Sequence, residues 1–249
     1  MTYHWHWAIL FDISPDGTHS YWQTLVIGAG WTVATAIVAW TLALTLGSIV
    51  GIMRTMPYPW LVRLSRAYVE LFRNIPLLVQ MFLWYFVLPE VVPVSFGNWL
   101  KQMPDASFWT AVVALGFYTS ARVAEQVRAG ITSMPRGQRL AALGLGLTLP
   151  QTYASVLLPM AYRIMLPPLT SEFLNIIKNS AVALTIGLME LTARARSMQE
   201  FSFQVFEAFT VATLIYIAIN LVVTLSMRRV ERAVAVPGYI GTAPRQLTS

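Results

Sequence analysis

One segment, residues 128–165, interrupts the series of apolar segments that dominates this chain. The segments on either side are apolar enough to cross a bilayer, but this one begins with several arginines and is punctuated by glycines. It is too polar at its start to span a membrane and too regular in its helix-forming residues to be a loose linker. We therefore expect it to form a shaped surface outside the membrane, offered to a soluble partner.

The composition places the rest of the chain in a membrane. Of the 249 residues, 56% are hydrophobic and only 11% are charged, whereas a soluble domain carries about 25% charged residues. The formal net charge of +6 could suggest nucleic acid, but the positions of the basic residues explain it better, and we expect no nucleic-acid partner. The surrounding partner is membrane lipid.

Five segments are predicted to span the membrane, each needing about 20 residues to cross the hydrocarbon. Four are read from hydropathy alone, and the second of them is short and is expected to extend back through residues 68–72. The fifth contains several polar residues and is still taken as a span. The fold class is therefore all-α, a multi-pass membrane protein with five transmembrane helices. The predicted spans are residues 24–53, 75–88, 108–127, 169–188 and 206–227.

The arginines and lysines indicate the orientation. The six segments outside the five spans carry 0, 4, 1, 4, 2 and 4 basic residues in chain order. Cytoplasmic segments carry the excess of positive charge, so the N-terminus is expected outside and the C-terminus inside the cell. This gives an extracytoplasmic segment at 1–23, a transmembrane domain at 24–225 and a cytoplasmic tail at 226–249.

The N-terminal segment is expected to carry neither a cleavable signal nor a metal site. Its first 20 residues contain no Lys or Arg, so the basic region of a signal peptide is missing and the first span is expected to be retained. His4 and His6 could bind a metal, but with Trp5 and Trp7 beside them an aromatic belt at the membrane interface is favoured, and no metal is predicted. The absence of cysteine excludes disulfides and thiolate metal sites.

Residues 140–159 read LAALGLGLTLPQTYASVLLP and predict two short helices. Ala141, Ala142 and Gly146 are small residues at helical spacing, which lets another element approach closely. Pro150 is expected to end the first helix, and the second is expected to run from Gln151 into Pro159. Two alternatives stay open from the spacing: a knob for a partner, or a pair of amphipathic helices lying in the headgroup layer.

This segment resembles the signature of the permease subunits of type I ABC importers. That signature is Glu-Ala-Ala, three residues, Gly, nine residues, then Ile-x-Leu-Pro, and only the Glu departs, being Leu140. The residues in register are Ala141, Ala142, Gly146, Val156, Leu158 and Pro159. Residues 70–80 (ELFRNIPLLVQ) and 124–131 (AEQVRAGI) extend the resemblance to the polar amino-acid branch, and in detail to glutamate/aspartate permeases.

The resemblance implies a type I ABC importer permease fold and a set of partners. Two permease subunits, identical or homologous, would form the pathway in the bacterial cytoplasmic membrane, and a periplasmic amino-acid-binding protein would deliver substrate. A cytoplasmic ATPase dimer would dock on a coupling helix within residues 137–159, around Leu140 to Gly146. No phosphate-binding Gly-x-x-x-x-Gly-Lys-Ser/Thr stretch is present, so the chain is expected to bind no cofactor and the partner to use the ATP.

Ionisable residues at bilayer depth need partners or a task, because each costs at least ~2.5–3.5 kcal/mol there. Arg122 and Glu125 are three residues apart on one predicted helical face. One interpretation is a mutual ion pair. The other places Arg122 in the pathway, where a guanidinium can hold a carboxylate with two hydrogen bonds. Compared with the pattern of the family that the chain resembles, Arg122 adds a positive charge. Asn179, in Lys178-Asn179-Ser180, removes a negative one. Both differences favour glutamate or aspartate as the substrate.

Polar residues of the predicted span 169–188, together with Asn74 just before the span 75–88, complete the candidate pathway. Glu172, Asn175 and Asn179 fall near one stripe, predicted to face the pathway, with a packing network between helices as the alternative. Asn74, before Pro76, marks either a helix break that gates the pathway or a simple helix start.

Two other classes of function fit the sequence less well. A self-powered, ion-coupled carrier could use Glu125 and Glu172 as proton sites, but five spans are too few for two inverted repeats in one chain. A membrane-embedded enzyme is disfavoured because no Gly-x-Ser-x-Gly, His-Glu-x-x-His or paired catalytic carboxylates occur in a span.

Overall fold

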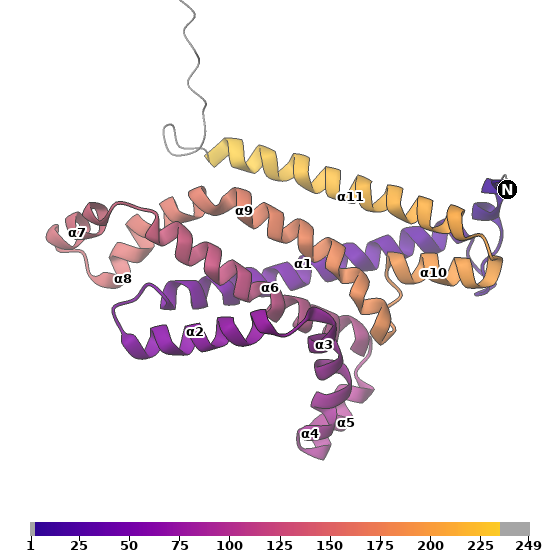
Figure 1. The fold of residues 1–249 in the computed structure, drawn as a ribbon, viewed down its shortest axis with the longest axis horizontal. Helices are drawn as coiled ribbons and strands as arrows, with labels where there is room; N and C mark the ends of the chain where they lie inside the picture. Colours follow the sequence, from indigo (N-terminus) through magenta and orange to yellow (C-terminus); the bar gives the residue numbers. More distant parts are fainter. Residues whose placement is uncertain (1–2, 235–249) are drawn as a thin grey trace, which may run out of the picture.

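The structure, a computed structural model, describes residues 3–234 and is helical throughout this part. Four long helices lie side by side, and α7 and α8 lie at the opposite end of the body from the N-terminus and α10 (Figure 1). Within the described residues, strand pairing is limited to an isolated bridge between Ile13 and Ser20. The long helices are α1 (Tyr21–Met53), α6 (Ala106–Thr132), α9 (Leu158–Asn179) and α11 (Val205–Val234).

Close backbone approach holds α1 against α6. A Cβ added at Gly47 would lie 2.7 Å from the carbonyl oxygen of Ser120, and one added at Gly51 would lie 2.8 Å from that of Ala124. Spacing two glycines four residues apart is a frequent way to bring two membrane helices together, because in lipid the packing of small residues replaces the hydrophobic driving force. This contact fixes the position of α6, which carries Arg122 and Glu125.

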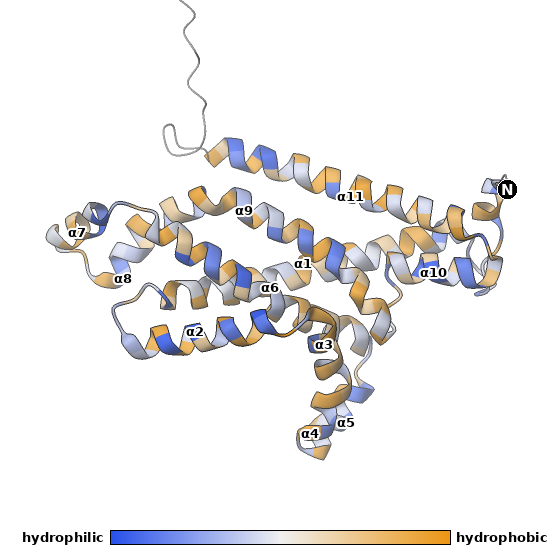
Figure 2. Cartoon of the chain, viewed as in Figure 1, coloured by the Kyte–Doolittle hydropathy of each residue, from blue (hydrophilic) through white to orange (hydrophobic). Residues whose placement is uncertain are grey.

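By length and apolar composition, two of the described helices can each cross a membrane. They are α1 and α11, and up to four spans result if two bent helix pairs each count as one. Figure 2 shows both helices largely apolar, with hydrophilic residues recurring along α2. α6 is long enough but carries Arg122, Glu125 and Arg128. The count of five spans stays a prediction.

The second predicted span does not extend straight back through residues 68–72. Those residues belong to α2 (Pro59–Asn74), which meets the following helical segment, Leu77–Val91, at a bend of 100°. Proline cannot donate a backbone hydrogen bond and disfavours helix in the residue before it, so Pro76 ends α2. The Gln80 side-chain amide then donates to the carbonyls of Phe72 and Ile75, both at 2.9 Å.

Beyond this bend the chain forms a helical arm that projects sideways from the body (Figure 1). A π-helical turn, Leu83–Val87, lies within its first limb, and the second limb packs back on the first. Gly97 allows this return, because an added Cβ would lie 2.1 Å from the carbonyl oxygen of Pro89. The helices of the arm are α3 (Leu77–Phe82), α4 (Leu88–Val91) and α5 (Val94–Gln102).

The two helices predicted around residues 140–159 exist, but their boundary differs from the prediction. α7 (Arg136–Gly144) ends before Pro150, and its last carbonyls accept hydrogen bonds from residues beyond it: Gly146 N donates to Leu143 at 3.0 Å and Leu147 N to Ala142 at 3.2 Å. Gly146 has φ +85°, the left-handed conformation that closes many helices. Glycine therefore ends the first helix.

Pro150 begins the next helix instead of ending the previous one. It lies in the first turn of α8 (Leu149–Thr152), where its missing N–H has no intrahelical role. α8 continues through a π-helical turn (Tyr153–Leu157) directly into α9, with Pro159 in the first turn of α9. The second helix of the predicted pair is thus the start of a long helix, Leu149–Ile186.

A fully buried carboxylate organises the far end of the molecule. Glu190 precedes α10 (Leu191–Ser202) and accepts hydrogen bonds from the backbone N–H of Thr192 at 3.0 Å and of Ala193 at 2.8 Å. Tyr216 of α11 donates to the same side chain at 2.8 Å, and Thr32 of α1 at 3.3 Å. The carboxylate therefore ties α1, α10 and α11 together while satisfying the first turn of α10.

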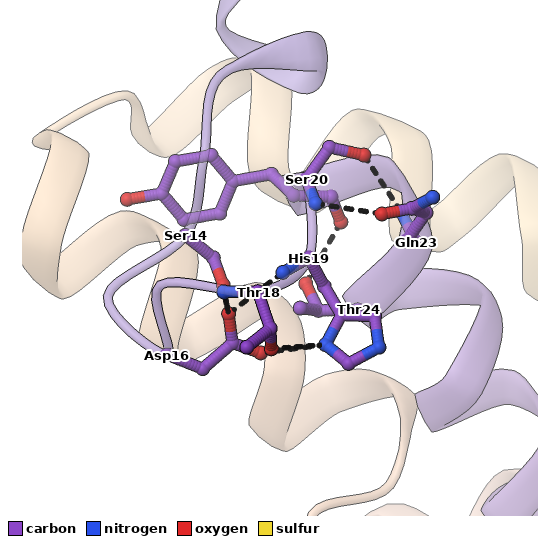
Figure 3. Close-up of polar contacts among 8 residues, drawn as sticks. Ser14, Asp16, Thr18, His19, Ser20, Gln23 and Thr24 are labelled. Carbon is purple, nitrogen blue, oxygen red and sulfur yellow. Dashed lines mark hydrogen bonds and ion pairs between the residues drawn. The ribbon is translucent and has the colours of Figure 1, made fainter.

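The chain enters α1 through a hydrogen-bonded loop. Asp16 accepts from the backbone N–H of Thr18 at 2.9 Å and of His19 at 3.0 Å, and from the hydroxyl of Ser14 at 2.8 Å (Figure 3). These bonds favour the charged form and hold the pKa of Asp16 well below its usual range. Ser20 then caps α1 together with Gln23.

Earlier residues pack on the start of α11. Tyr3 donates to the carboxylate of Glu207, and the backbone N–H of His6 donates to it at 2.7 Å. Trp5 stacks on Trp7 with ring centroids 5.0 Å apart. No group of three or more potential metal ligands from His, Cys, Asp and Glu occurs in residues 3–234, and the aromatic belt remains the prediction for this segment.

Candidate functional site

A polar cavity in the middle of the helical body contains three of the predicted pathway residues. It measures about 380 Å³, and its lining comes from α2, α6 and α9. The lining residues are Arg73, Tyr118, Arg122, Glu125, Gln126 and Glu172. These helices carry ionisable side chains between apolar segments, and a cavity is where such groups can keep water or a polar ligand.

Arg122 and Glu125 do not pair with each other, so the interpretation of a mutual ion pair is wrong. Arg122 donates to the hydroxyl of Tyr118 at 2.6 Å and lies 4.8 Å above the centroid of that ring. Its nearest carboxylate is Glu172 on α9, with 3.7 Å between Nη1 and Oε2. This distance allows Coulomb attraction but is too long for a hydrogen bond.

Glu125 is held by arginines on both sides. Arg54, at the end of α1, pairs with it closely, Arg128 Nε donates to it at 3.0 Å, and Arg73 Nη1 lies 3.5 Å away. One carboxylate thus joins the ends of α1 and α2 to the C-terminal part of α6. Its acceptor capacity is used by these arginines, which leaves it little to offer a ligand.

Glu172 is in the opposite situation. Its side chain is 13% exposed, and its Oε2 atom is buried without a hydrogen-bond partner in the described part of the chain. A buried carboxylate oxygen left without a donor costs free energy, so it attracts any donor that can enter the cavity.

The cluster of charges around the cavity carries an excess of positive charge. Within the lining, Arg73 and Arg122 are balanced by Glu125 and Glu172. Arg54 and Arg128 pair with Glu125 from outside the lining, so the cluster as a whole, four guanidinium groups and two carboxylates, has two positive charges in excess. Such a site favours a ligand with more carboxylates than ammonium groups.

Other predicted pathway residues lie outside this lining. Asn175 and Asn179 are half-buried and Lys178 is exposed on α9, while Asn74 is exposed at the end of α2. Of the predicted stripe on α9, Glu172 alone reaches the cavity. α2 ends at Asn74 and α3 starts at Leu77, which fits both interpretations of Asn74, and a gating role for this break stays a prediction.

Tyr118, Gln126 and Arg73 were not predicted as site residues. Tyr118 stands four residues before Arg122 and Gln126 four residues after it, so helical spacing alone could have placed both near the Arg122 face. Arg73 had no such signal, because its approach depends on the bend at Pro76.

The predicted coupling residues are unequally exposed. Leu140 is 67% exposed and Ala141, Gly146 and Pro159 are exposed as well. Ala142 is only 4% exposed, so within this chain it is a packing residue and not part of the free face of α7. A Cβ added at Gly146 would meet nothing within 4 Å.

Residues 43–236 match the family described as the binding-protein-dependent transport system inner membrane component. The chain belongs to this family of ABC importer permeases. It is 47% identical over 244 residues to the glutamate/aspartate import permease protein GltJ of Escherichia coli K12, covering 97% of this chain and 99% of that protein. It is also 33% identical to the probable glutamine permease GlnM of Bacillus subtilis, covering 90% and 96% of the two chains.

Solved structures agree on the fold. An amino acid ABC transporter crystallised with histidines is 30% identical, with a TM-score of 0.73 over 86% of this chain and 95% of that one. The inward-facing MetNI methionine transporter gives a TM-score of 0.70 over 86% and 98% of the two chains at 21% identity, a likeness in fold alone. The expected permease fold is confirmed.

Membership of the family decides several predictions. The chain is a multi-pass inner-membrane permease of an ATP-driven amino-acid importer, so the ion-coupled carrier is excluded. Its relatives are transporter subunits and not enzymes, and importers of this family work with an ATPase and a binding protein.

Proposed function

We propose that this chain is the permease subunit of an importer for acidic amino acids, glutamate and aspartate. The relative with 47% identity carries that substrate in its name, although a more distant relative is named for glutamine. The excess of guanidinium groups in the cluster around the central cavity supports the acidic substrate, because glutamine has one carboxylate fewer.

The observation that carries the proposal is that no carboxylate of the described residues is hydrogen-bonded to Arg122. Its guanidinium lines the cavity and lies 3.7 Å from Glu172 without a hydrogen bond to it. A substrate carboxylate would replace this weak contact with two parallel hydrogen bonds to a preorganised, Tyr118-bound guanidinium. The substrate ammonium would then donate to the unpartnered Oε2 of Glu172.

The proposed arrangement in the membrane has five crossings, made by α1, α2 with the arm, α6, α8 with α9, and α11. The N-terminus would lie outside and the end of α11 inside. This is supported by the location of α7 and α8, rich in nearby arginines, at the opposite end from the N-terminus (Figure 1). The predicted tail beyond Val234, including Arg245, lies outside the described residues. Reporter fusions at both ends test the orientation, and two ends on one side would contradict it.

We propose α7 as the coupling helix on which a separate ATPase dimer docks. The partner would hydrolyse the ATP, and a second permease subunit, identical or homologous, would complete the pathway. Support comes from the exposed Leu140 and from the exposed Ala141 beside it. ATP hydrolysis would then be coupled to transport through a surface on which Leu140 stands where the family signature has a glutamate.

The substrate proposal is tested by replacing Arg122 in a reconstituted transporter. Arg122→Tyr should lower ATP-driven glutamate uptake by tenfold or more, since a charge-assisted bidentate contact is worth about 1.5–3 kcal/mol. Arg122→Lys should recover only part of the rate, because an ammonium cannot form the planar pair. Basal ATP hydrolysis and assembly should be unchanged.

A double variant separates substrate binding from simple charge balance. Arg122→Leu with Glu172→Leu removes both members of the cavity pair and leaves no stranded charge. Full glutamate uptake by this variant would reject the substrate role of Arg122. Normal assembly without uptake is the expected result.

The coupling proposal is tested at Ala141, because Gly146 is confounded by its left-handed backbone. Ala141→Trp adds bulk to the free face of α7 and should uncouple ATP hydrolysis from transport. Ala154→Trp, at another exposed alanine, is the matched control. If both variants transport the same amount of substrate per ATP hydrolysed, α7 is not the docking element.

A further inference from the structure

A second basic cavity lies where α1, α6 and α7 meet, distinct from the central one. It measures about 390 Å³ and is bounded by Arg54 at the end of α1, by Ile131 near the end of α6, and by Arg136 and Arg139 in the first turn of α7. None of the predicted pathway or coupling residues lines it. We propose that this cavity binds the phosphate headgroup of an acidic phospholipid.

The level of the cavity fits a headgroup. α1 is one of the two helices that can cross a membrane by length and composition, and Arg54 is the residue directly after its last turn. No charged residue occurs between Tyr21 and Met53, so Arg54 is the first charge after the apolar stretch, as expected where hydrocarbon gives way to headgroups on either side of the membrane. The three arginines of the cavity therefore lie at the depth of lipid phosphates.

Two of the three arginines of the cavity are available to an anion. Arg54 is held in place by Glu125, with its side chain 13% exposed. Arg136 and Arg139 form no ion pair or side-chain hydrogen bond with the other residues between 3 and 234. A guanidinium matches a phosphate with paired hydrogen bonds.

The floor of the cavity favours a lipid over a free phosphate ion. Ile131, Tyr153 and Leu157 are buried apolar or aromatic residues of this lining. Tyr153 donates to the carbonyl of Thr55 at 2.8 Å, which fixes one wall. A basic rim above an apolar floor suits a headgroup with its glycerol and upper acyl chain, and basic pockets at helix ends are known to take acidic lipids.

The test is lipid retention by the purified full chain in mild detergent, measured by native mass spectrometry. Phosphatidylglycerol should be retained in preference to phosphatidylcholine. Arg136→Gln with Arg139→Gln should weaken phosphatidylglycerol binding on the order of twentyfold, at about fivefold per arginine. Arg136→Lys with Arg139→Lys should give an intermediate loss, because charge is kept but the paired geometry is not.

A matched control removes two arginines elsewhere. Arg63→Gln with Arg66→Gln changes the net charge equally on exposed residues of α2, outside the cavity, and should leave the retention unchanged. Equal losses in both double variants would overturn the proposal in favour of general charge attraction.

Two further outcomes would also overturn it. If millimolar inorganic phosphate displaces the lipid and the ion binds as tightly as the lipid does, the cavity is a site for soluble phosphate. Unchanged lipid retention in the Arg136 and Arg139 variant, together with loss of a co-purifying protein, would mean that the cavity is a protein contact. A monodisperse elution profile for each variant excludes misfolding as the cause.

Discussion

Two pairs of glutamates in this chain are held by different chemistry. Glu190 and Glu207 are 0% exposed and accept hydrogen bonds from neutral donors, namely backbone N–H groups and the hydroxyls of tyrosine and threonine. Glu125 and Glu172 line a cavity and face arginines. The first pair joins helices, whereas in the second pair Glu125 is held by its arginines and Glu172 can exchange its partner for a ligand.

The difference follows from how completely each carboxylate is satisfied. A buried carboxylate whose oxygens are all bonded to fixed donors is rigid, and removing it strands those donors. Glu172 has an oxygen without a hydrogen-bond partner among the described residues, so its contact can be replaced at small cost. Stability and transport should therefore respond separately when Glu190 and Glu172 are mutated.

The largest effect on stability is expected at Glu190. Glu190→Ala strands the N–H groups of Thr192 and Ala193 and the hydroxyl of Tyr216, and should lower the free energy of unfolding by about 3 kcal/mol or more. Thermal unfolding in detergent measures this. Glu200→Ala, at an exposed residue of the same helix, is the control, and equal shifts in both variants would break the comparison.

Glu125 should give the next largest effect. Glu125→Leu leaves the arginines around it without a carboxylate, and it should cost about 2–3 kcal/mol, visible as lost assembly. Adding Arg54→Leu should recover part of the loss, because Arg54 is the most buried of these arginines. A double-mutant cycle with no coupling between the two residues would contradict the role of Glu125 as the joint between α1 and α6.

Glu172→Gln should leave stability within about 1 kcal/mol of the native chain. Glutamate uptake should nevertheless fall about tenfold, because the substrate ammonium loses a charged acceptor. Uptake assays and thermal unfolding on the same preparation give both numbers. A stability loss as large as that of Glu190→Ala would place Glu172 with the joining residues.

The smallest effect is expected at Tyr3. Its hydrogen bond to Glu207 raises the pKa of the phenol to about 12 from an ordinary value of about 10. The contribution to stability is therefore present below pH 10 and is lost as the pH rises through 12. The absorbance difference between the native chain and Tyr3→Phe should titrate near pH 12, and titration near pH 10 would mean that the contact does not form in solution.

The sequence predicted the features that depend on local pattern. The all-helical class and the helix pair near residue 140 follow from composition and 3.6-residue spacing. The sequence pattern places the end of the first helix at Pro150, whereas α7 ends at Gly144 and Gly146 closes it, because a proline can either end a helix or begin the next one. Only the left-handed backbone at Gly146 decides between the two.

The sequence could not predict which charges meet. Arg122 and Glu125 share a face of α6, yet each finds its partner on another helix: Glu172 on α9 and Arg54 after α1. Such pairings depend on how helices pack, and helix packing is set by contacts such as Gly47 against Ser120. The approach of Arg73 likewise depends on the 100° bend.

The most direct test of the central claim is substrate uptake by the transporter reconstituted in proteoliposomes with its ATPase and binding protein. We expect ATP-dependent uptake of glutamate and aspartate, with glutamine transported at least tenfold more slowly, since one missing charge contact costs about 1.5–3 kcal/mol. Equal rates for glutamine and glutamate would contradict an acidic substrate for the arginine-lined cavity.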